Sequence, residues 1–257
     1  MTHKVKGIIL NKKDYRENDR LFVIYTDELG KIEAAARGVR KIKSKMAGHL
    51  NYFSIIDLMV ASGKNHYQIA SAEIDKNFLN LKSDLIKIIL ASYCLEIVDS
   101  FVKQEHKDLK IYELIEELLE VFNSEREIIS DMYYFLAKVF ILKLLALLGW
   151  TPELFYCLKC KKNILPDGNL LDASKGGLIC GACGRGRGSV LSVSNDTIKI
   201  LRFILQKDLK NLTVLKINKS HLNEVAKIIS LFLLIHQDKE LKSDRWINSL
   251  TRFSAIC

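Results

Sequence analysis

Residues 5–36 read VKGIILNKKDYRENDRLFVIYTDELGKIEAAA, and they set the pattern of the N-terminal third. Apolar runs rich in β-branched and aromatic side chains alternate with polar turns, which is typical of short strands. Only the Ala34–Ala36 run is equally compatible with a helix. Five short strands within the first 80 residues predict a small barrel, with the five-stranded OB fold as the leading candidate. The expected strands are Val5–Leu10, Leu21–Thr26, Lys31–Ala36, Phe53–Ala61 and Tyr67–Ala72.

The period of the apolar residues changes after residue 82 and becomes helical, with Ser83 as the expected N-cap of the first helix. Gly149 predicts the end of a long apolar helix, and Thr151 and Pro152 predict the start of another. This long helix is apolar on nearly all sides, so it is expected to be buried and central. The later expected helices are Ile111–Phe122, Met132–Trp150, Asp196–Gln206 and His221–His236.

Four of the six cysteines form two Cys-x2-Cys pairs, Cys157 with Cys160 and Cys180 with Cys183, separated by nineteen residues. This spacing predicts a four-thiolate zinc site. Because the chain supplies all four ligands, no position stays open for water, and the expected Zn²⁺ is structural, one per chain. Four free thiols and an iron–sulfur cluster are the alternative interpretations.

The chain of 257 residues is 49% hydrophobic and contains only two prolines, which excludes a disordered chain because this much apolar surface can be buried. Its start lacks a secretory signal, and Lys138 and Lys143 interrupt the longest apolar stretch, so a cytoplasmic protein without a membrane segment is expected. Cys94 is predicted to be a buried structural thiol. No role follows from the sequence for Cys257.

The net charge of +9 is distributed unevenly along the chain. Residues 1–81 carry +5, residues 82–156 carry −5, residues 157–191 carry +4 and residues 192–257 carry +5. We therefore predict an α+β protein with three regions. These are an N-terminal OB-fold barrel (1–81), an α-helical domain (82–156 and 192–257) and an inserted four-cysteine zinc-binding segment (157–191).

The densest positive charge lies in residues 37–45, RGVRKIKSK, which contain five cations and no acid. Cations grouped beside a β-barrel can follow a phosphate backbone and release counterions as they bind. A solvated loop that only keeps the chain soluble is the alternative. The aromatic rings of Tyr52 and Phe53 nearby could stack on bases or belong to the core.

Two further classes of site were weighed. The chain has no Gly-x4-Gly-Lys-Ser/Thr phosphate loop and no His-Glu-x2-His pair, so neither ATP hydrolysis nor a zinc protease is indicated. Four glutamates share one helix face and could hold a divalent metal in a nuclease, although a solvated face is the simpler interpretation. They are Glu113, Glu116, Glu117 and Glu120.

Several motifs occur in a recognisable order from end to end. They are DYRENDRL (14–21), ARGVRKIKS (36–44), GHL (48–50), LGWTP (148–152), GGLIC (176–180) and the segment Phe232–Ser243. In these motifs the chain resembles the RecO family of bacterial DNA repair and recombination mediators. The resemblance implies an OB fold, a helical bundle and a zinc-binding insertion, in agreement with the three regions above.

The resemblance also implies a non-enzymatic function. A RecO-like protein binds single- and double-stranded DNA, anneals complementary strands, and with RecR helps to load the RecA recombinase. It contacts the acidic C-terminal tail of the single-stranded-DNA-binding protein, and Lys138 and Lys143 are the candidates for that contact. It would act in the cytoplasm at the nucleoid. A zinc-containing regulator or scaffold that docks proteins without annealing is the alternative. The implied DNA contacts are Arg37, Arg40, Lys41, Lys43 and Lys45.

Overall fold

The computed structural model describes residues 1–125, 130–166, 168–185, 190–237, 241–243 and 247, so Cys257 lies outside the described residues. The chain divides into two compact units, one within residues 1–127 and 241–257 and the other within residues 128–240. Among the described residues, no helix combines the length and the apolar character needed to cross a membrane.

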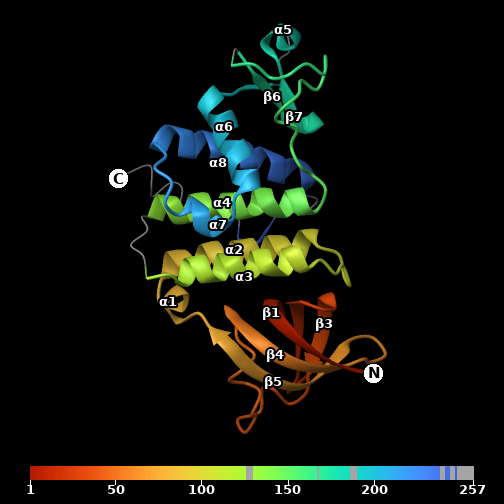
Figure 1. The fold of residues 1–257 in the computed structure, drawn as a ribbon. Helices are drawn as coiled ribbons and strands as arrows, with labels where there is room; N and C mark the ends of the chain where they lie inside the picture. Colours follow the sequence, from red (N-terminus) through yellow and green to blue (C-terminus); the bar gives the residue numbers. More distant parts are fainter. Residues whose placement is uncertain (126–129, 167, 186–189, 238–240, 244–246, 248–257) are drawn as a thin grey trace. The chain divides into compact units, whose positions relative to one another are not determined.

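The first unit begins with a closed five-stranded barrel (Figure 1). Around the barrel the strand order is β1-β2-β3-β5-β4, and β1 pairs with both β2 and β4. All pairs are antiparallel except β3 with β5. This topology confirms the OB fold. The strands are β1 (Thr2–Asp14), β2 (Arg20–Thr26), β3 (Gly30–Ala36), β4 (Ser54–Ala61) and β5 (Tyr67–Asn77).

Small residues allow the barrel to close tightly. Gly7 of β1 faces Ile24 and Leu58, and a β-carbon at Gly7 would lie 2.6 Å from the Ile24 side chain. The alanine run at the end of β3 is a strand because it pairs residue by residue with β2, from Arg20 opposite Ala36 to Phe22 opposite Ala34. Tertiary pairing thus decides between the two conformations that the alanines allow.

Among the described residues, the first unit also contains the helices α1 (Leu79–Lys82), α2 (Leu85–Phe101) and α3 (Leu109–Asn123). In Figure 1, α2 and α3 lie side by side next to the barrel. The predicted N-cap Ser83 is wrong, because Ser83 ends α1 and its hydroxyl donates to the Asn80 carbonyl (2.9 Å). The N-cap of α2 is Asp84, whose Oδ1 accepts from the N–H groups of Ile86 (2.8 Å) and Lys87 (3.1 Å).

The second unit is built around α4 (Ser130–Leu147), whose apolar residues are buried on all sides, as predicted. Gly149, at φ 92°, ends this helix region as expected. The predicted new helix at Thr151–Pro152 is wrong, because the chain runs on to Glu153, whose N–H donates to the Gly176 carbonyl (2.8 Å). Three more helices of this unit are α6 (Asn195–Gln206), α7 (Leu209–Leu212) and α8 (Lys219–His236).

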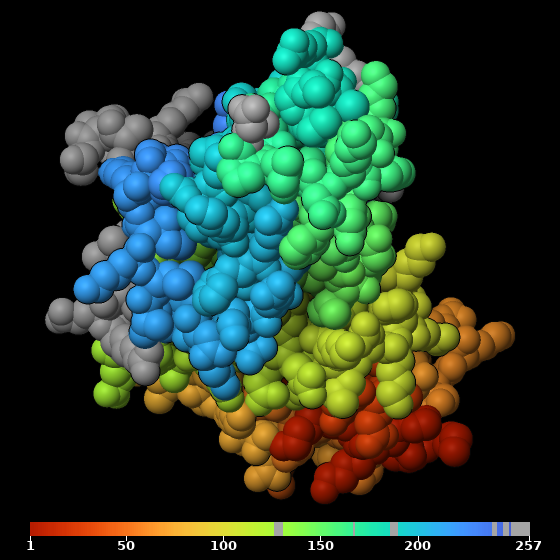
Figure 2. Space-filling model, turned by 45° about the horizontal axis from the view of Figure 1, so that its top comes forward, coloured from red at the N-terminus to blue at the C-terminus, as the bar shows by residue number. Residues whose placement is uncertain are grey.

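The cysteine segment adds a small lobe to the second unit. Its three strands form a sheet with the order β7-β6-β8. On the face shown in Figure 2, the residues of α6 to α8 (cyan to blue) lie beside the green residues that lead into this lobe. The lobe contains β6 (Leu170–Asp172), the 3₁₀ turn η1 (Ala173–Lys175), β7 (Gly177–Ile179), α5 (Gly181–Gly184) and β8 (Leu191–Ser192).

Glu224 of α8 holds the start of α6. One carboxylate oxygen accepts from the Ser194 N–H (2.9 Å), and the other accepts from the hydroxyls of Ser194 (2.7 Å) and Thr197 (2.6 Å). Burial alone would raise the pKa of Glu224, but these donors outweigh burial and the pKa is lowered. Because Ser194 is also the N-cap of α6, the carboxylate supports the helix terminus.

We expect Glu224→Gln to lower the free energy of unfolding at pH 7 by about 1–2 kcal/mol, because hydrogen bonds to a charged, partly exposed acceptor are lost. The folded pKa lies below the unfolded one, so this contribution is present above about pH 4.5 and is lost as the pH falls through the folded pKa. Urea unfolding at several pH values measures it. The difference in the free energy of unfolding between Glu224→Gln and the unmodified protein should disappear in acid. Replacing the exposed Lys227 of the same helix by glutamine should leave the free energy of unfolding unchanged. A stability difference that does not depend on pH would contradict a stabilising role of the Glu224 carboxylate.

Candidate nucleic-acid interface and metal site

The basic loop, defined as residues 37–45, follows β3 and carries the five predicted DNA contacts, all of them exposed. Val39, 5% exposed, points into the barrel core, and Leu50 beyond the loop is buried in the same core. The apolar anchors therefore fix the backbone while the cations face solvent. The structure brings Arg37, Arg40, Lys41, Lys43 and Lys45 together on one surface loop.

The connection between β1 and β2 braces the basic loop. The Gly38 N–H donates to Asp19 Oδ1 (2.8 Å), and the Arg40 N–H donates to the Asn18 carbonyl (3.1 Å). Gly38 has φ 62°, a left-handed conformation that favours glycine. The cations are thus presented from a backbone that is hydrogen-bonded to the barrel, which reduces the entropy lost when they bind an anion.

Arg40 differs from the other four cations. Its Nη1 lies 3.3 Å from Asp14 Oδ2, and Asp14 Oδ1 accepts from Arg20 Nε (2.8 Å). The hydrogen bond from Arg20, aided by Arg40, lowers the pKa of Asp14. Sequence reasoning missed Asp14 because strand pairing brings it to the loop from a distant position. Within the described part of the chain, Arg37, Lys41, Lys43 and Lys45 form no ion pair.

The two aromatic residues near the loop take different positions. Phe53 is 7% exposed and lies in the core, so it does not offer a stacking surface. Tyr52 is half-buried, and Lys12 Nζ lies 4.8 Å from the centre of its ring. The core interpretation is therefore correct for Phe53, and Lys12 lies over the ring of Tyr52.

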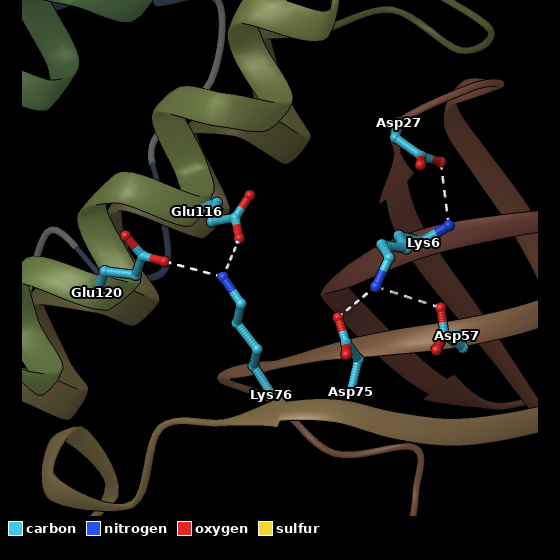
Figure 3. A network of polar contacts seen from close by, with 7 residues as sticks. All are labelled: Lys6, Asp27, Asp57, Asp75, Lys76, Glu116 and Glu120. Carbon is cyan, nitrogen blue, oxygen red and sulfur yellow. Dashed lines mark hydrogen bonds and ion pairs between the residues drawn. The ribbon is translucent and has the colours of Figure 1, made fainter.

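Two of the four glutamates of α3 pair with a lysine from the barrel (Figure 3). Lys76 Nζ of β5 donates to Glu116 Oε1 (2.7 Å) and Glu120 Oε1 (3.0 Å), and these bonds raise the pKa of Lys76. Among the described residues, the only group arranged to hold a metal is the four cysteines. Two of the four carboxylates that the nuclease interpretation requires are therefore engaged by Lys76.

A second lysine in the same view contacts three aspartates of the barrel. Lys6 Nζ is paired with Asp75 and lies 3.5 Å from Asp57 Oδ1, while the Lys6 N–H donates to Asp27 Oδ1 (3.0 Å) (Figure 3). The hydrogen bond to Asp75 raises the pKa of Lys6. Both lysines of Figure 3 therefore serve the fold of the first unit, whereas the lysines of the basic loop have no ion-pair partner among the described residues.

The four cysteines of the lobe meet at one point. Their Sγ atoms all lie within 4.8 Å of one another, and Cys160 Sγ is 3.9 Å from Cys180 Sγ. Tetrahedral zinc with bonds of about 2.3 Å places neighbouring sulfurs about 3.8 Å apart. The donor set and its spacing therefore fit a four-thiolate metal ion. The isolated Cys94, by contrast, is fully buried in α2, as predicted.

Backbone hydrogen bonds bring the two cysteine pairs together. The Leu178 N–H donates to the Glu153 carbonyl (2.9 Å), and the Leu158 N–H donates to the Leu178 carbonyl (2.9 Å). The first pair turns at Lys161, whose N–H donates to the Cys157 carbonyl (2.9 Å). The second pair turns where the Cys183 N–H donates to the Cys180 carbonyl (3.0 Å). Each Cys-x2-Cys pair thus forms a tight turn that places its two sulfurs on the same side.

The thiols of the cluster differ in acidity. Burial alone would raise the pKa of Cys157, but the N–H groups of Cys160 and Cys180 lower it to about 6. The hydrogen bond with Cys180 raises the pKa of Cys183 to about 12. Thiolates bind metal, so Cys157 is prepared as a ligand at neutral pH, and binding would release a proton from Cys183.

Gly177→Ala is expected to weaken metal binding by about 5- to 150-fold, because a clash of about 1–3 kcal/mol in the lobe opposes metal binding that is coupled to folding. A β-carbon at Gly177 would lie 2.6 Å from the Glu153 carbonyl oxygen, which is backbone and cannot turn away. Competition with a chromophoric chelator measures the affinity. Gly48→Ala is the control, since a β-carbon there meets nothing within 4 Å. Unchanged affinity in Gly177→Ala would show that the strand contact does not support the site.

The two lysines predicted to contact a partner lie on α4. Lys138 is 3% exposed, with its Nζ 5.3 Å from the centre of the Tyr134 ring, and Lys143 is half-buried. The partner contact therefore stays a prediction at both positions, with Lys143 the more exposed of the two.

Comparison with known proteins covers nearly the whole chain. The family model described as "Recombination protein O N terminal" matches residues 1–78, and that described as "Recombination protein O C terminal" matches residues 82–245. A DNA repair protein RecO of Dehalococcoides mccartyi is 31% identical over 97% of this chain and 96% of its own length. The DNA repair protein RecO of Clostridium novyi is 30% identical over 97% and 94%. That of Thermoanaerobacter sp. is 28% identical over 96% and 97%.

Proposed function

Because the chain belongs to the RecO family of DNA repair proteins, we propose that it is a recombination mediator that binds single- and double-stranded DNA and anneals complementary strands. With RecR it helps to load RecA onto DNA covered by the single-stranded-DNA-binding protein. The observation that carries this proposal is the braced basic loop, on which Arg37, Lys41, Lys43 and Lys45 keep their charge unpaired within the described residues. The proposed mediator is not an enzyme.

Annealing follows from charge neutralisation. Two single strands repel each other through their phosphates, and a surface that neutralises both lowers this repulsion while leaving the bases free to pair. Phosphate contacts carry no sequence information, so the activity is expected to depend little on base sequence. It is also expected to slow as salt rises, because salt screens the cations of the loop.

We assign the parts of this function to three regions. The barrel (1–81) binds nucleic acid, the helical domain (82–156 and 192–257) docks protein partners, and the insertion (157–191) holds a metal. We propose Zn²⁺, bound by Cys157, Cys160, Cys180 and Cys183, and this metal supplies a structural cross-link between the two cysteine pairs. The acidic tail of the single-stranded-DNA-binding protein would meet α4 near Lys143 and Lys138, and the protein would act in the cytoplasm at the nucleoid.

A strand-annealing assay tests the proposal. Complementary oligonucleotides are coated with the single-stranded-DNA-binding protein, either intact or without its acidic tail, and annealing is followed with and without this chain. Annealing that is faster with the chain present and that needs the tail is expected. A folded chain that holds its metal but neither binds nor anneals oligonucleotides would favour the alternative, a zinc-containing regulator or scaffold.

A further inference from the structure

Two rings meet at the tips of neighbouring barrel connections. Tyr15 lies between β1 and β2 and is 42% exposed, and His66 lies just before β5. Their ring centres are 5.8 Å apart, with an interplanar angle of 86°. His66 Nδ1 lies 3.2 Å from Glu33 Oε2 of β3, which holds the imidazole in place. The edge-to-face contact leaves a large part of the Tyr15 ring open to solvent.

A hollow of about 530 Å³ lies beside His66. Its walls include the carboxylates of Glu33 and Glu105 and one ammonium, that of Lys64, so the acidic groups outnumber the cation and disfavour a phosphate. An uncharged flat group meets no such repulsion. The remaining lining includes Ser62, Asn65, Tyr67 and Gln104, which offer both donors and acceptors to a polar edge.

The ring pair is continuous with the basic loop. The connection that carries Tyr15 is the one whose Asn18 and Asp19 brace the backbone of that loop. The Arg16 guanidinium lies over the Tyr15 ring, 5.3 Å from its centre, so a cation is held at this exposed ring. A strand whose phosphates lie along the basic loop would therefore bring its bases towards Tyr15.

We propose that Tyr15 and His66 form a stacking platform for one unpaired nucleobase, and that this platform makes the barrel prefer single strands over duplex. The inference rests on the proposed function, since it requires that the basic loop binds phosphates. Every base has a π-face, so the platform tolerates any sequence. A base within a duplex is already stacked and paired and is not available to it.

Tyr15→Ala is expected to weaken binding of a single-stranded oligonucleotide by about 5- to 150-fold, as expected for the loss of one stacked base. Tyr15→Leu, which keeps apolar bulk without a π-face, should lose nearly as much, while Tyr15→Phe should bind as the parent does. Duplex affinity and the dependence of log K on log salt should not change, because no phosphate contact is removed. Equal losses on single strands and duplex, or no loss on single strands, would overturn the proposal.

A measurement on the unmodified chain covers the case in which the alanine variant fails to fold. Single strands carrying 5-iodouracil are bound and irradiated, and the cross-linked residue is identified by mass spectrometry. Adducts at Tyr15 or His66 are expected, and adducts found only elsewhere would overturn the platform. Failure of the unmodified chain to bind any oligonucleotide would refute the proposed function itself. Normal binding that depends on the basic loop but not on Tyr15 would refute the platform alone.

Discussion

Replacing Lys41, Lys43 and Lys45 together by glutamine is expected to reduce the affinity for single-stranded DNA by about 50-fold at 0.15 M salt. Each lysine that neutralises one phosphate adds about 0.7 to the slope of log K against log salt, so three should remove about 2 from it. These three side chains are exposed and form no ion pair within the described residues, so their removal breaks no internal contact that the structure shows. Fluorescence anisotropy with a labelled oligonucleotide, titrated at several salt concentrations, gives both quantities.

The matched control removes the same charge from the connection between α2 and α3 and from the first turn of α3. Lys103, Lys107 and Lys110 are also exposed, and their replacement by glutamine lowers the net charge from +9 to +6, as the loop variant does. If general attraction explained binding, both variants would lose the same affinity and slope. If the basic loop is the interface, only the loop variant should lose them. Equal losses of affinity and salt slope in the two variants would show that the basic loop is not the DNA interface.

Cys183→Ser is expected to abolish stoichiometric metal binding and to unfold the lobe around the cysteines. Binding of structural zinc is worth about 10–16 kcal/mol at neutral pH and is coupled to folding. The lobe contains only short strands and one-turn helices, so few other interactions would stabilise it without the metal. Elemental analysis of the purified protein measures the metal and identifies it as zinc or iron. Limited proteolysis between residues 157 and 185 should be slow in the parent and rapid in the variant.

Cys94→Ala is the control for this variant, because Cys94 is buried in α2 and lies outside the cluster. It should keep one metal per chain and the slow proteolysis of the parent. The barrel belongs to the other compact unit, so Cys183→Ser should retain the salt slope of single-strand binding. A Cys183→Ser protein that still held one metal per chain and resisted proteolysis would contradict a structural role for the four thiolates.

The local pattern of the sequence predicted the elements well where one physical signal dominated. Alternating apolar runs located the five strands, and the spacing of the cysteines located the cluster that could hold a metal ion, because both depend on residues close together in the chain. The predicted positions of the helix ends were less accurate. Ser83 and Asp84 are both good N-caps, and only the presence of the short α1 assigns Ser83 to its end and leaves Asp84 to begin α2.

Charged residues show where the local pattern was insufficient. Lys31 reads as the polar start of a strand, yet its side chain is 8% exposed, and its Nζ donates to Asp99 Oδ1 (2.9 Å) and to the Val102 carbonyl (3.0 Å). Lys138 reads as a cation available to a partner, and it is 3% exposed. The sequence does not show whether a lysine is paired, buried or free, because its state depends on which distant segments pack against it.

The sequence by itself determined the barrel, the helical character of the later part, the four cysteines that could hold a metal ion and the position of the densest positive charge. Each of these features depends on the composition of the chain or on the spacing of residues that are close together in it. The tertiary structure alone decided which of these charges are paired: Lys76 pairs with Glu116 and Glu120 of α3, and Arg40 pairs with Asp14. It also placed Tyr15 against His66. These pairings join residues that are far apart in the chain, and only the closed barrel and the helices packed on it bring them within contact distance.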